Sequence, residues 1–330
     1  MDYRKATGIG LIAILLWSTI VGLIRGVSEG LGPVGGAAAI YSLSALILLV
    51  TVGLPRLNTF PRSYLLLGSL LFVSYEICLS LSLGYAASST QAIEVGMVNY
   101  LWPALTVLLS IAVLRQKCSL LIVPGLALSL IGICRVLAGD HPLSLAEIDR
   151  SVASNPLSYG LALSGALIWA LYCVVTKKIA NGSNGITLFF LLTALALWLK
   201  YFSAPQPEMV MNWRVGACLA LAALAMGFGY AAWNIGILHG NVTVLATASY
   251  FIPVLSALLA ALLLNSSLSL AFWQGAGMVS AGSLICWWST RQKGQRGGRA
   301  VNSAVVSDWL DEFPSPSRII TNGPTNSEKI

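Results

Sequence analysis

Glu76 is an acidic residue in the middle of a long apolar run at about residues 64–86. A charged side chain at the centre of a bilayer costs roughly 2.5–3.5 kcal/mol even on the lowest scales, so it is expected to face a cavity, find a partner or hold a proton. Ser80 and Gly84 follow at four-residue steps and extend a small, polar stripe along the same helix face. We therefore predict a function for Glu76; the alternative is a protonated acid that only links neighbouring helices.

Glu94 is a second acid in apolar sequence, near the start of a run at about residues 92–113. A carboxylate in the first turn of a helix is stabilised by the positive end of the helix dipole. Ser88, Ser89 and Thr90 come just before it and belong to the types that cap helix N-termini. We expect Glu94 to have this structural capping role.

Many tryptophan and tyrosine residues lie away from the ends of the apolar runs, whereas membrane proteins usually place these types at the lipid headgroups. Tyr230, Trp233, Asn234 and Ile237 share one helix face by their spacing. Aromatic rings with a polar tip suit a pocket for a ring-bearing or cationic ligand; the alternative is ordinary packing between helices. For the group as a whole we predict a pocket. Its aromatic members are Trp17, Tyr75, Tyr100, Trp102, Trp169, Tyr172, Tyr230, Trp233 and Tyr250.

The motifs of common enzymes are absent from the sequence. It contains no glycine loop with Lys and Ser/Thr for phosphate binding, no HExxH and no GxSxG. The two histidines, His141 and His239, are expected at opposite faces, and the six cysteines form no CxxC pair. We therefore expect no enzymatic activity, no metal site and no cofactor, with the cysteines acting as small apolar residues.

Composition points to a membrane protein. The chain has 330 residues, of which 57% are hydrophobic and 9% charged, and its mean hydropathy is +0.80. About a quarter of the residues of a soluble domain are charged. The apolar runs reach about 18 residues or more, the length that spans a bilayer. We predict an all-α polytopic protein with ten transmembrane helices, near residues 6–24, 33–53, 64–86, 92–113, 119–138, 157–176, 185–203, 215–238, 242–264 and 268–289.

The sequence repeats itself loosely at an interval of about 150 residues. Tyr100 and Pro103 recur as Tyr250 and Pro253. Each copy holds five predicted spans, an odd number, so the second copy must enter the membrane from the opposite side. The prediction is two inverted five-helix repeats, with the substrate path between them. The predicted units are residues 1–138, an external linker at 139–156, and residues 157–290.

Four glycines repeat at the same interval. Gly125 and Gly132 recur as Gly275 and Gly282, and each pair lies seven residues apart on one helix face. We predict that they allow close helix packing and bind no ligand.

Lysine and arginine residues set the predicted orientation. Placing the N-terminus in the cytoplasm puts twelve of the nineteen on the cytoplasmic side before the far tail is counted, and five on the other. The positive-inside rule then predicts that both termini are cytoplasmic. Residues 291–330 are polar and are expected to form a disordered cytoplasmic tail.

Several stretches carry a resemblance to a known family: Leu16–Thr19, Val21–Pro33, Ser74–Cys78, Gln91–Pro103 and Ala232–Asn241. Over about residues 4–292 the chain resembles the EamA branch of the drug/metabolite transporter superfamily, and within it the aromatic amino acid exporters of bacterial inner membranes. This resemblance implies ten helices around a central cavity, and export of Phe, Tyr and Trp by alternating access. It places Glu76, Tyr100, Trp102 and Trp169 at the cavity. Many members carry a glutamate at the end of the fourth span of each repeat, which this sequence lacks at residues 114–117 and 264–267.

Three functional hypotheses remain open from the sequence. The leading one is an aromatic amino acid exporter, in which Glu76 would bind the substrate ammonium or a proton. The second is an exporter of hydrophobic cations with Glu76 as counter-ion, and the third is a non-transporting membrane scaffold or receptor that acts through its tail. The expected partners are a small-molecule substrate and the lipid bilayer, without nucleic acid, and no sequence feature indicates an oligomeric state.

Overall fold

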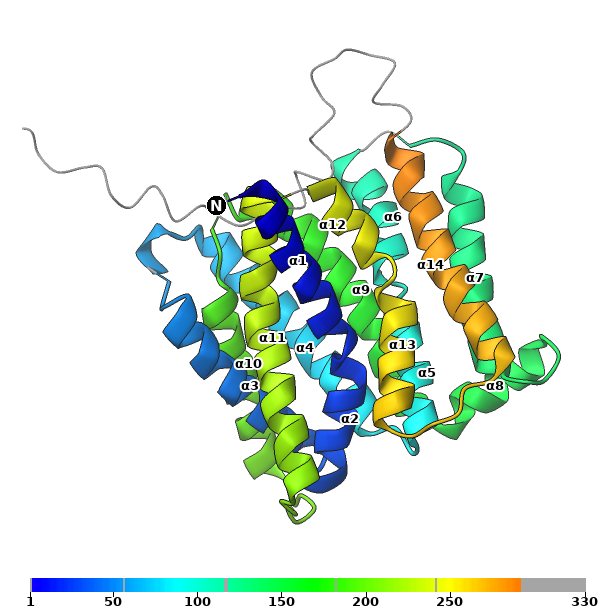
Figure 1. Ribbon diagram of the computed structural model, residues 1–330, viewed down its shortest axis with the longest axis horizontal. Helices are drawn as coiled ribbons and strands as arrows, with labels where there is room; N and C mark the ends of the chain where they lie inside the picture. Colours follow the sequence, from blue (N-terminus) through cyan, green and yellow to red (C-terminus); the bar gives the residue numbers. More distant parts are fainter. Residues whose placement is uncertain (1, 56, 116–117, 182, 241, 292–330) are drawn as a thin grey trace, which may run out of the picture.

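The computed structural model describes residues 2–55, 57–115, 118–181, 183–240 and 242–291. Within these ranges every regular element is a helix (Figure 1). The predicted tail beyond Arg291 lies outside the described residues. The elements are α1 (Tyr3–Ser18), α2 (Ile20–Leu31), α3 (Pro33–Thr51), η1 (Leu57–Thr59), η2 (Tyr64–Gly68), α4 (Ser69–Gly84), α5 (Ser89–Asn99), α6 (Trp102–Leu114), α7 (Ile122–Ala138), α8 (Leu145–Ser154), α9 (Pro156–Ile179), α10 (Ile186–Ser203), α11 (Trp213–His239), α12 (Val242–Ser249), α13 (Ile252–Leu263) and α14 (Leu270–Arg291).

Seven helical stretches of the described chain are long and apolar enough to cross a membrane. Helix is also present in each of the ten ranges predicted from hydropathy. The prediction of an all-α polytopic membrane protein is confirmed, and the arrangement of ten spans as two inverted repeats stays a prediction. The seven stretches are Tyr3–Leu31, Pro33–Thr51, Tyr64–Gly84, Ser89–Val113, Pro156–Thr176, Ile186–Ser203 and Trp213–Trp233.

Two of the predicted spans are interrupted near their middle. The break between α5 and α6 falls at Tyr100 and Leu101, and the break between α12 and α13 falls 150 residues later. Pro103 and Pro253 explain both positions, because proline has no N–H to donate to the carbonyl four residues earlier and its ring clashes there. The repeat in the sequence is thus also a repeat of broken helices.

The four repeated glycines allow α7 and α14 to pack closely. A Cβ atom built on Gly132 would lie 2.8 Å from the carbonyl oxygen of Gly275, and one on Gly125 would lie 3.0 Å from that of Gly282. The pairing of an early residue of α7 with a late residue of α14 means that the two helices run antiparallel (Figure 1). The predicted close packing is confirmed.

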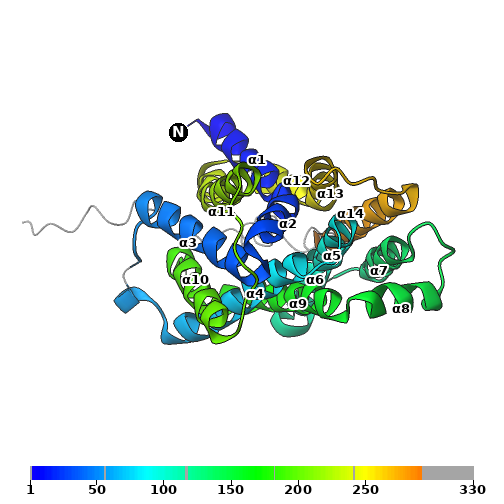
Figure 2. The same cartoon turned by 90° about the horizontal axis from the view of Figure 1, so that it is seen from below.

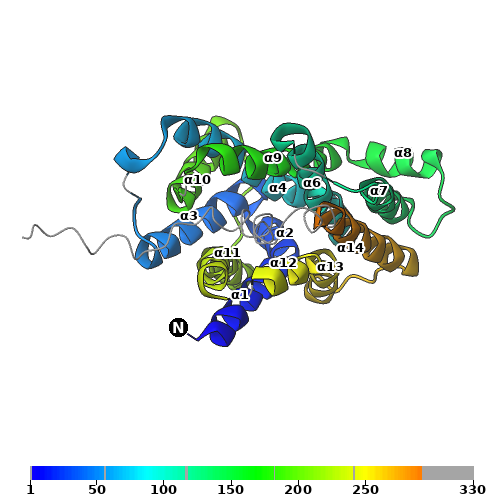
Figure 3. The ribbon, with the colours of Figure 1, turned by 90° about the horizontal axis from the view of Figure 1, so that it is seen from above.

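Seen along the helices, the molecule has an elongated outline. Figure 2 shows α3 and α10 at one end and α7 and α14 at the other. Figure 3, from the opposite side, shows α1, α11 and α13 along one long side and α4, α6 and α9 along the other, with α2 between them. The main packed pairs are α1 with α11, α4 with α9, α3 with α10, and α7 with α14. Helix α2 joins the two long sides, since it contacts α11 and α13 on one and α4 on the other.

The segment predicted as an external linker contains a helix, α8. Ser144 begins it as N-cap, since its hydroxyl accepts a hydrogen bond of 3.3 Å from the backbone N–H of Glu147. Ser144 and Glu147 have the spacing of a capping box, and Ile148 and Val152 pack against the core. The prediction of a linker over residues 139–156 did not include this helix, because the capping pattern was overlooked.

Candidate functional site

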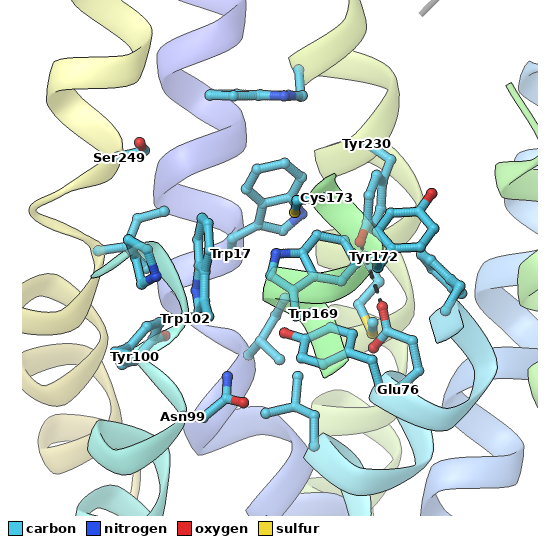
Figure 4. Close-up of a pocket in the computed structure, with 18 of the residues that line it drawn as sticks. Trp17, Glu76, Asn99, Tyr100, Trp102, Trp169, Tyr172, Cys173, Tyr230 and Ser249 are labelled. Atoms are coloured by element: carbon cyan, nitrogen blue, oxygen red, sulfur yellow. Dashed lines mark hydrogen bonds between the residues drawn. The ribbon is translucent and has the colours of Figure 1, made fainter. Parts of the chain in front are cut away.

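A cavity of about 160 Å³ lies in the interior, at the level of the two broken helices (Figure 4). Helices α1, α4, α5, α6, α9, α11 and α13 all contribute to its wall. Eight of the nine residues predicted for the site line it. They are Trp17, Tyr75, Glu76, Tyr100, Trp102, Trp169, Tyr230 and Trp233. The ninth is Asn234, whose side chain lies outside the described part of the structure.

The helix breaks bring several of these residues to the cavity. Tyr100 ends α5 as its C-cap and Trp102 begins α6, so both belong to the interruption of one span. Ser249, the last residue of α12, and Tyr250, in the matching interruption, line the same cavity. The two breaks therefore each contribute residues to the cavity wall.

The aromatic rings contact one another around the cavity. Trp169 lies at the centre of one group, with its ring centroid 4.4 Å from Tyr75 at 33° and 5.0 Å from Tyr172 at 19°. Trp17 lies at the centre of a second group, since its ring centroid is 5.2 Å from that of Tyr230 and 5.2 Å from that of Trp233. One of these four pairs is stacked, one is edge-to-face and two are tilted. The rings pack against each other and also leave a shared aromatic surface facing the cavity.

Phe72 belongs to the site and was not predicted. Its buried ring lines the cavity and lies 6.0 Å from Trp169, 5.6 Å from Tyr172 and 6.4 Å from Tyr230. It stands one helical turn before Glu76 on α4, hence on the same face. That spacing could have identified it, but phenylalanine lacks the polar tip by which the other aromatic residues were recognised.

Glu76 is buried and engaged by two tyrosines from other helices. The hydroxyl of Tyr41 on α3 donates to Oε2 at 2.5 Å, and that of Tyr230 on α11 donates to Oε1 at 3.4 Å. The hydroxyl of Ser80 in turn donates to Tyr41 at 3.3 Å. Glu76 therefore links α3, α4 and α11 and also lines the cavity. Tyr41 was missed because one tyrosine in an apolar run is not distinguishable from a core residue.

Glu94 does not have the capping role predicted for it. Helix α5 begins at Ser89, so Glu94 lies beyond the first turn, which contains no acid. Ser88 is the N-cap, and its hydroxyl accepts from the N–H of Gln91 at 3.1 Å. Oε2 of Glu94 instead accepts a hydrogen bond of 2.9 Å from the hydroxyl of Tyr159 on α9. The prediction was wrong because the helix starts three residues earlier than the hydropathy indicated.

A polar cluster at the same end of the molecule joins α5 to α9 as well. The amide nitrogen of Asn155 donates to the side-chain oxygen of Gln91 at 2.9 Å and to the carbonyl of Tyr85 at 2.9 Å. Gln91 donates to the hydroxyl of Ser154 at 3.1 Å. With the pair of Glu94 and Tyr159, these bonds connect two helices that belong to different copies of the repeat.

Comparison with known proteins identifies the family. Residues 156–288 match the EamA-like transporter family. The chain is 64% identical over 293 residues to the aromatic amino acid exporter YddG of Salmonella typhimurium, a match that covers 89% of this chain and 100% of the relative. YddG of Escherichia coli is 64% identical over 292 residues, with 88% and 100% covered, and YddG of Ancylobacter novellus is 31% identical, with 78% and 88% covered.

A crystal structure of a protein 21% identical to this chain superposes with a TM-score of 0.60, covering 88% of this chain and 99% of the other, and shows a shared fold. The identities to the curated relatives go further, because they extend over the whole length of two of those proteins. The chain therefore belongs to the EamA-like transporter family, in its group of YddG exporters.

Proposed function

We propose that this transporter exports phenylalanine, tyrosine, tryptophan and related small molecules through the described cavity, from the cytoplasm across the bacterial inner membrane. The cavity wall, with Trp169 between Tyr75 and Tyr172, is the observation that carries the proposal. A cavity of about 150 Å³ holds one benzene molecule in another protein. The volume found here therefore suits one aromatic ring, and the names of the relatives point to the same substrates.

Two inverted five-helix repeats are the architecture we propose for this export. The antiparallel packing of α7 on α14 supports it, since a two-fold axis in the membrane plane relates the fifth span of one copy to the fifth span of the other in this way. The contacts between copies also occur in matched sets. The pair α1 and α11 corresponds to the pair α9 and α4, and α2 with α13 corresponds to α9 with α5.

The described conformation is one in which the cavity leads toward the cytoplasm. Its wall extends to Tyr64, Asn184 and Ile186, which lie beside the predicted cytoplasmic loops. The other end is held together by the pair of Glu94 and Tyr159 and by the bonds of Asn155. In alternating access these external bonds break while the cytoplasmic end closes, and the substrate leaves on the opposite side.

Export of an amino acid agrees with the site better than export of a hydrophobic cation. Glu76 is the only carboxylate among the described residues of the wall, so a cation exporter would need its oxygens as counter-charge. Both oxygens already accept hydrogen bonds from Tyr41 and Tyr230. The aromatic surface is the larger part of the wall and is suited to a ring.

Growth of cells that overproduce the chain tests the proposed function. These cells should survive concentrations of toxic phenylalanine and tryptophan analogues that stop cells with the empty vector, and should accumulate less of the labelled analogue. A toxic aliphatic amino acid analogue is the matched control. Equal sensitivity to the aromatic analogues in both strains would refute export of aromatic amino acids, and equal protection against the aliphatic one would refute selectivity for an aromatic ring.

A further inference from the structure

Asn99 lines the cavity and carries a buried polar atom without a hydrogen-bond partner, which lies beside Gly165 of α9 in the described conformation. Its side chain is 3% exposed, it ends α5, and it lines the wall between Tyr100 and Glu76 (Figure 4). The carboxamide oxygen Oδ1 is buried and has no hydrogen-bond partner in the described structure. Buried polar groups are nearly always paired in folded proteins, so an unpaired one on a residue of the cavity wall is available to a ligand group.

The surroundings of Asn99 leave room for this side chain and offer it no cation. Gly165 of α9 lies opposite, and a Cβ atom there would lie 3.2 Å from Oδ1. Among the described residues of the wall there is no lysine or arginine, and Glu76 accepts hydrogen bonds from Tyr41 and Tyr230. A positively charged group bound next to Asn99 would thus have to come from the substrate.

The backbone at the same place adds to this preference for a positive group. Asn99 is the last residue of α5, and the C-terminal end of a helix carries a partial negative charge of about half an electron. Its carbonyl lacks the usual donor four residues later, because that residue is Pro103. In other transporters, such carbonyls of broken helices coordinate the coupling cations Na⁺ or H⁺.

We propose that Asn99 binds the α-ammonium group of the amino acid substrate. The ammonium N–H groups donate hydrogen bonds to Oδ1 and to the main-chain carbonyl oxygen of Asn99. Rotation about the terminal side-chain torsion, which is broad and roughly two-fold in asparagine, turns Oδ1 from Gly165 to the cavity. The substrate ring then lies against the rings around Trp169. Glu76 has the separate task of holding α3, α4 and α11 together. This assignment rests on the proposed function and specifies how the same site recognises an amino acid.

Three ligands that carry the same phenyl ring show whether the amino group or the carboxylate is recognised. Phenylalanine has both groups, phenethylamine lacks the carboxylate, and 3-phenylpropionate lacks the amino group. Their binding is measured with wild type, Asn99→Ala and Asn99→Leu, by inhibition of labelled phenylalanine flux in proteoliposomes. A second measurement, the rise in Tm on adding each ligand in detergent, does not require transport. Thr193→Val removes a buried hydroxyl from α10, outside the cavity wall, and is the matched control.

Loss of Asn99 should weaken the binding of phenylalanine and of phenethylamine about ten-fold or more, as expected for a hydrogen bond to a charged group. The binding of 3-phenylpropionate should stay within two-fold of that of wild type. Thr193→Val should change none of the three. Equal weakening of all three ligands, or of 3-phenylpropionate alone, would overturn the assignment while export of phenylalanine by wild type still stood. If wild type neither moves nor binds phenylalanine, the proposed function fails and the assignment fails with it.

Discussion

The ring of Trp169 on α9 lies 4.4 Å from the ring of Tyr75 on α4, at an angle of 33° between their planes. The two residues come from different copies of the sequence repeat, and both line the cavity. Tyr172 stacks on the same indole, one helical turn away at i+3. The surface offered to a substrate ring is therefore assembled from both halves of the chain.

Replacing Trp169 by alanine removes the centre of this surface. Trp169→Ala should lower resistance to toxic aromatic analogues at least ten-fold, because stacking and apolar contact are both lost, and Trp169→Phe should keep part of it. Growth and accumulation of labelled analogue measure the effect. Trp288→Ala is the control, since Trp288 is 58% exposed and does not line the cavity. Full resistance of Trp169→Ala at equal protein level would rule out the assigned wall.

Glu76 and Tyr41 should act as a structural pair. Glu76→Gln leaves only one acceptor oxygen for two tyrosine hydroxyls, and Tyr41→Phe removes the shorter of the two bonds. Each change should cost about 1–3 kcal/mol, observed as a lower Tm in detergent, because a buried polar group loses its partner.

The double variant Glu76→Gln/Tyr41→Phe separates a shared bond from two unrelated effects. The stability lost by the double variant should be clearly smaller than the sum of the losses in the two single variants, since both changes remove the same hydrogen bond. Additive losses would contradict the pairing. If Glu76→Gln instead left Tm unchanged and abolished efflux of hydrophobic cations, the counter-ion hypothesis would replace the structural one.

Close packing of α7 on α14 depends on Gly275. A Cβ there would meet the side chain of Val136 at 2.7 Å and its backbone nitrogen at 3.0 Å, so Gly275→Val should force the helices apart and lower Tm strongly. Gly277 lies on the same helix with nothing within 4 Å of a built Cβ, which makes Gly277→Val the matched control. The Tm values of the two variants are measured by thermal unfolding in the same detergent. Similar Tm values for the two variants would contradict the packing described.

The bond between Tyr159 and Glu94 should hold the external end closed. Tyr159→Phe removes it and should shift the equilibrium toward opening by about 1 kcal/mol, or about five-fold. Hydrogen exchange of the α5 backbone amides, measured by mass spectrometry, should rise accordingly. Tyr3→Phe, at an exposed position on α1, is the control. Unchanged exchange in α5 would show that the bond does not contribute to closure.

The sequence predicted those parts of the molecule that the membrane constrains strongly. Apolar length identified the helical ranges, and Glu76 and the internal aromatics stood out because lipid makes such residues costly or unusual. Gly132 and Gly275 were placed correctly because their interval matched the repeat.

Pairings between distant helices could not be predicted in this way. Tyr41 as partner of Glu76, and Tyr159 as partner of Glu94, depend on how helices face one another, which hydropathy does not encode. Asn99 lay within a stretch that supported the family resemblance, but its unpaired oxygen is visible only in three dimensions. Helix α8 was overlooked although Ser144 and Glu147 form a recognisable capping pattern.

Counterflow of labelled phenylalanine into proteoliposomes tests the central claim most directly. Vesicles holding the purified chain and loaded with unlabelled phenylalanine, tyrosine or tryptophan should take up the label transiently. Vesicles loaded with leucine or a quaternary ammonium drug should not, and Trp169→Ala should reduce uptake at least ten-fold. Uptake that is equal with leucine inside, or no uptake at all by correctly inserted protein, would contradict an aromatic amino acid exporter built around this cavity.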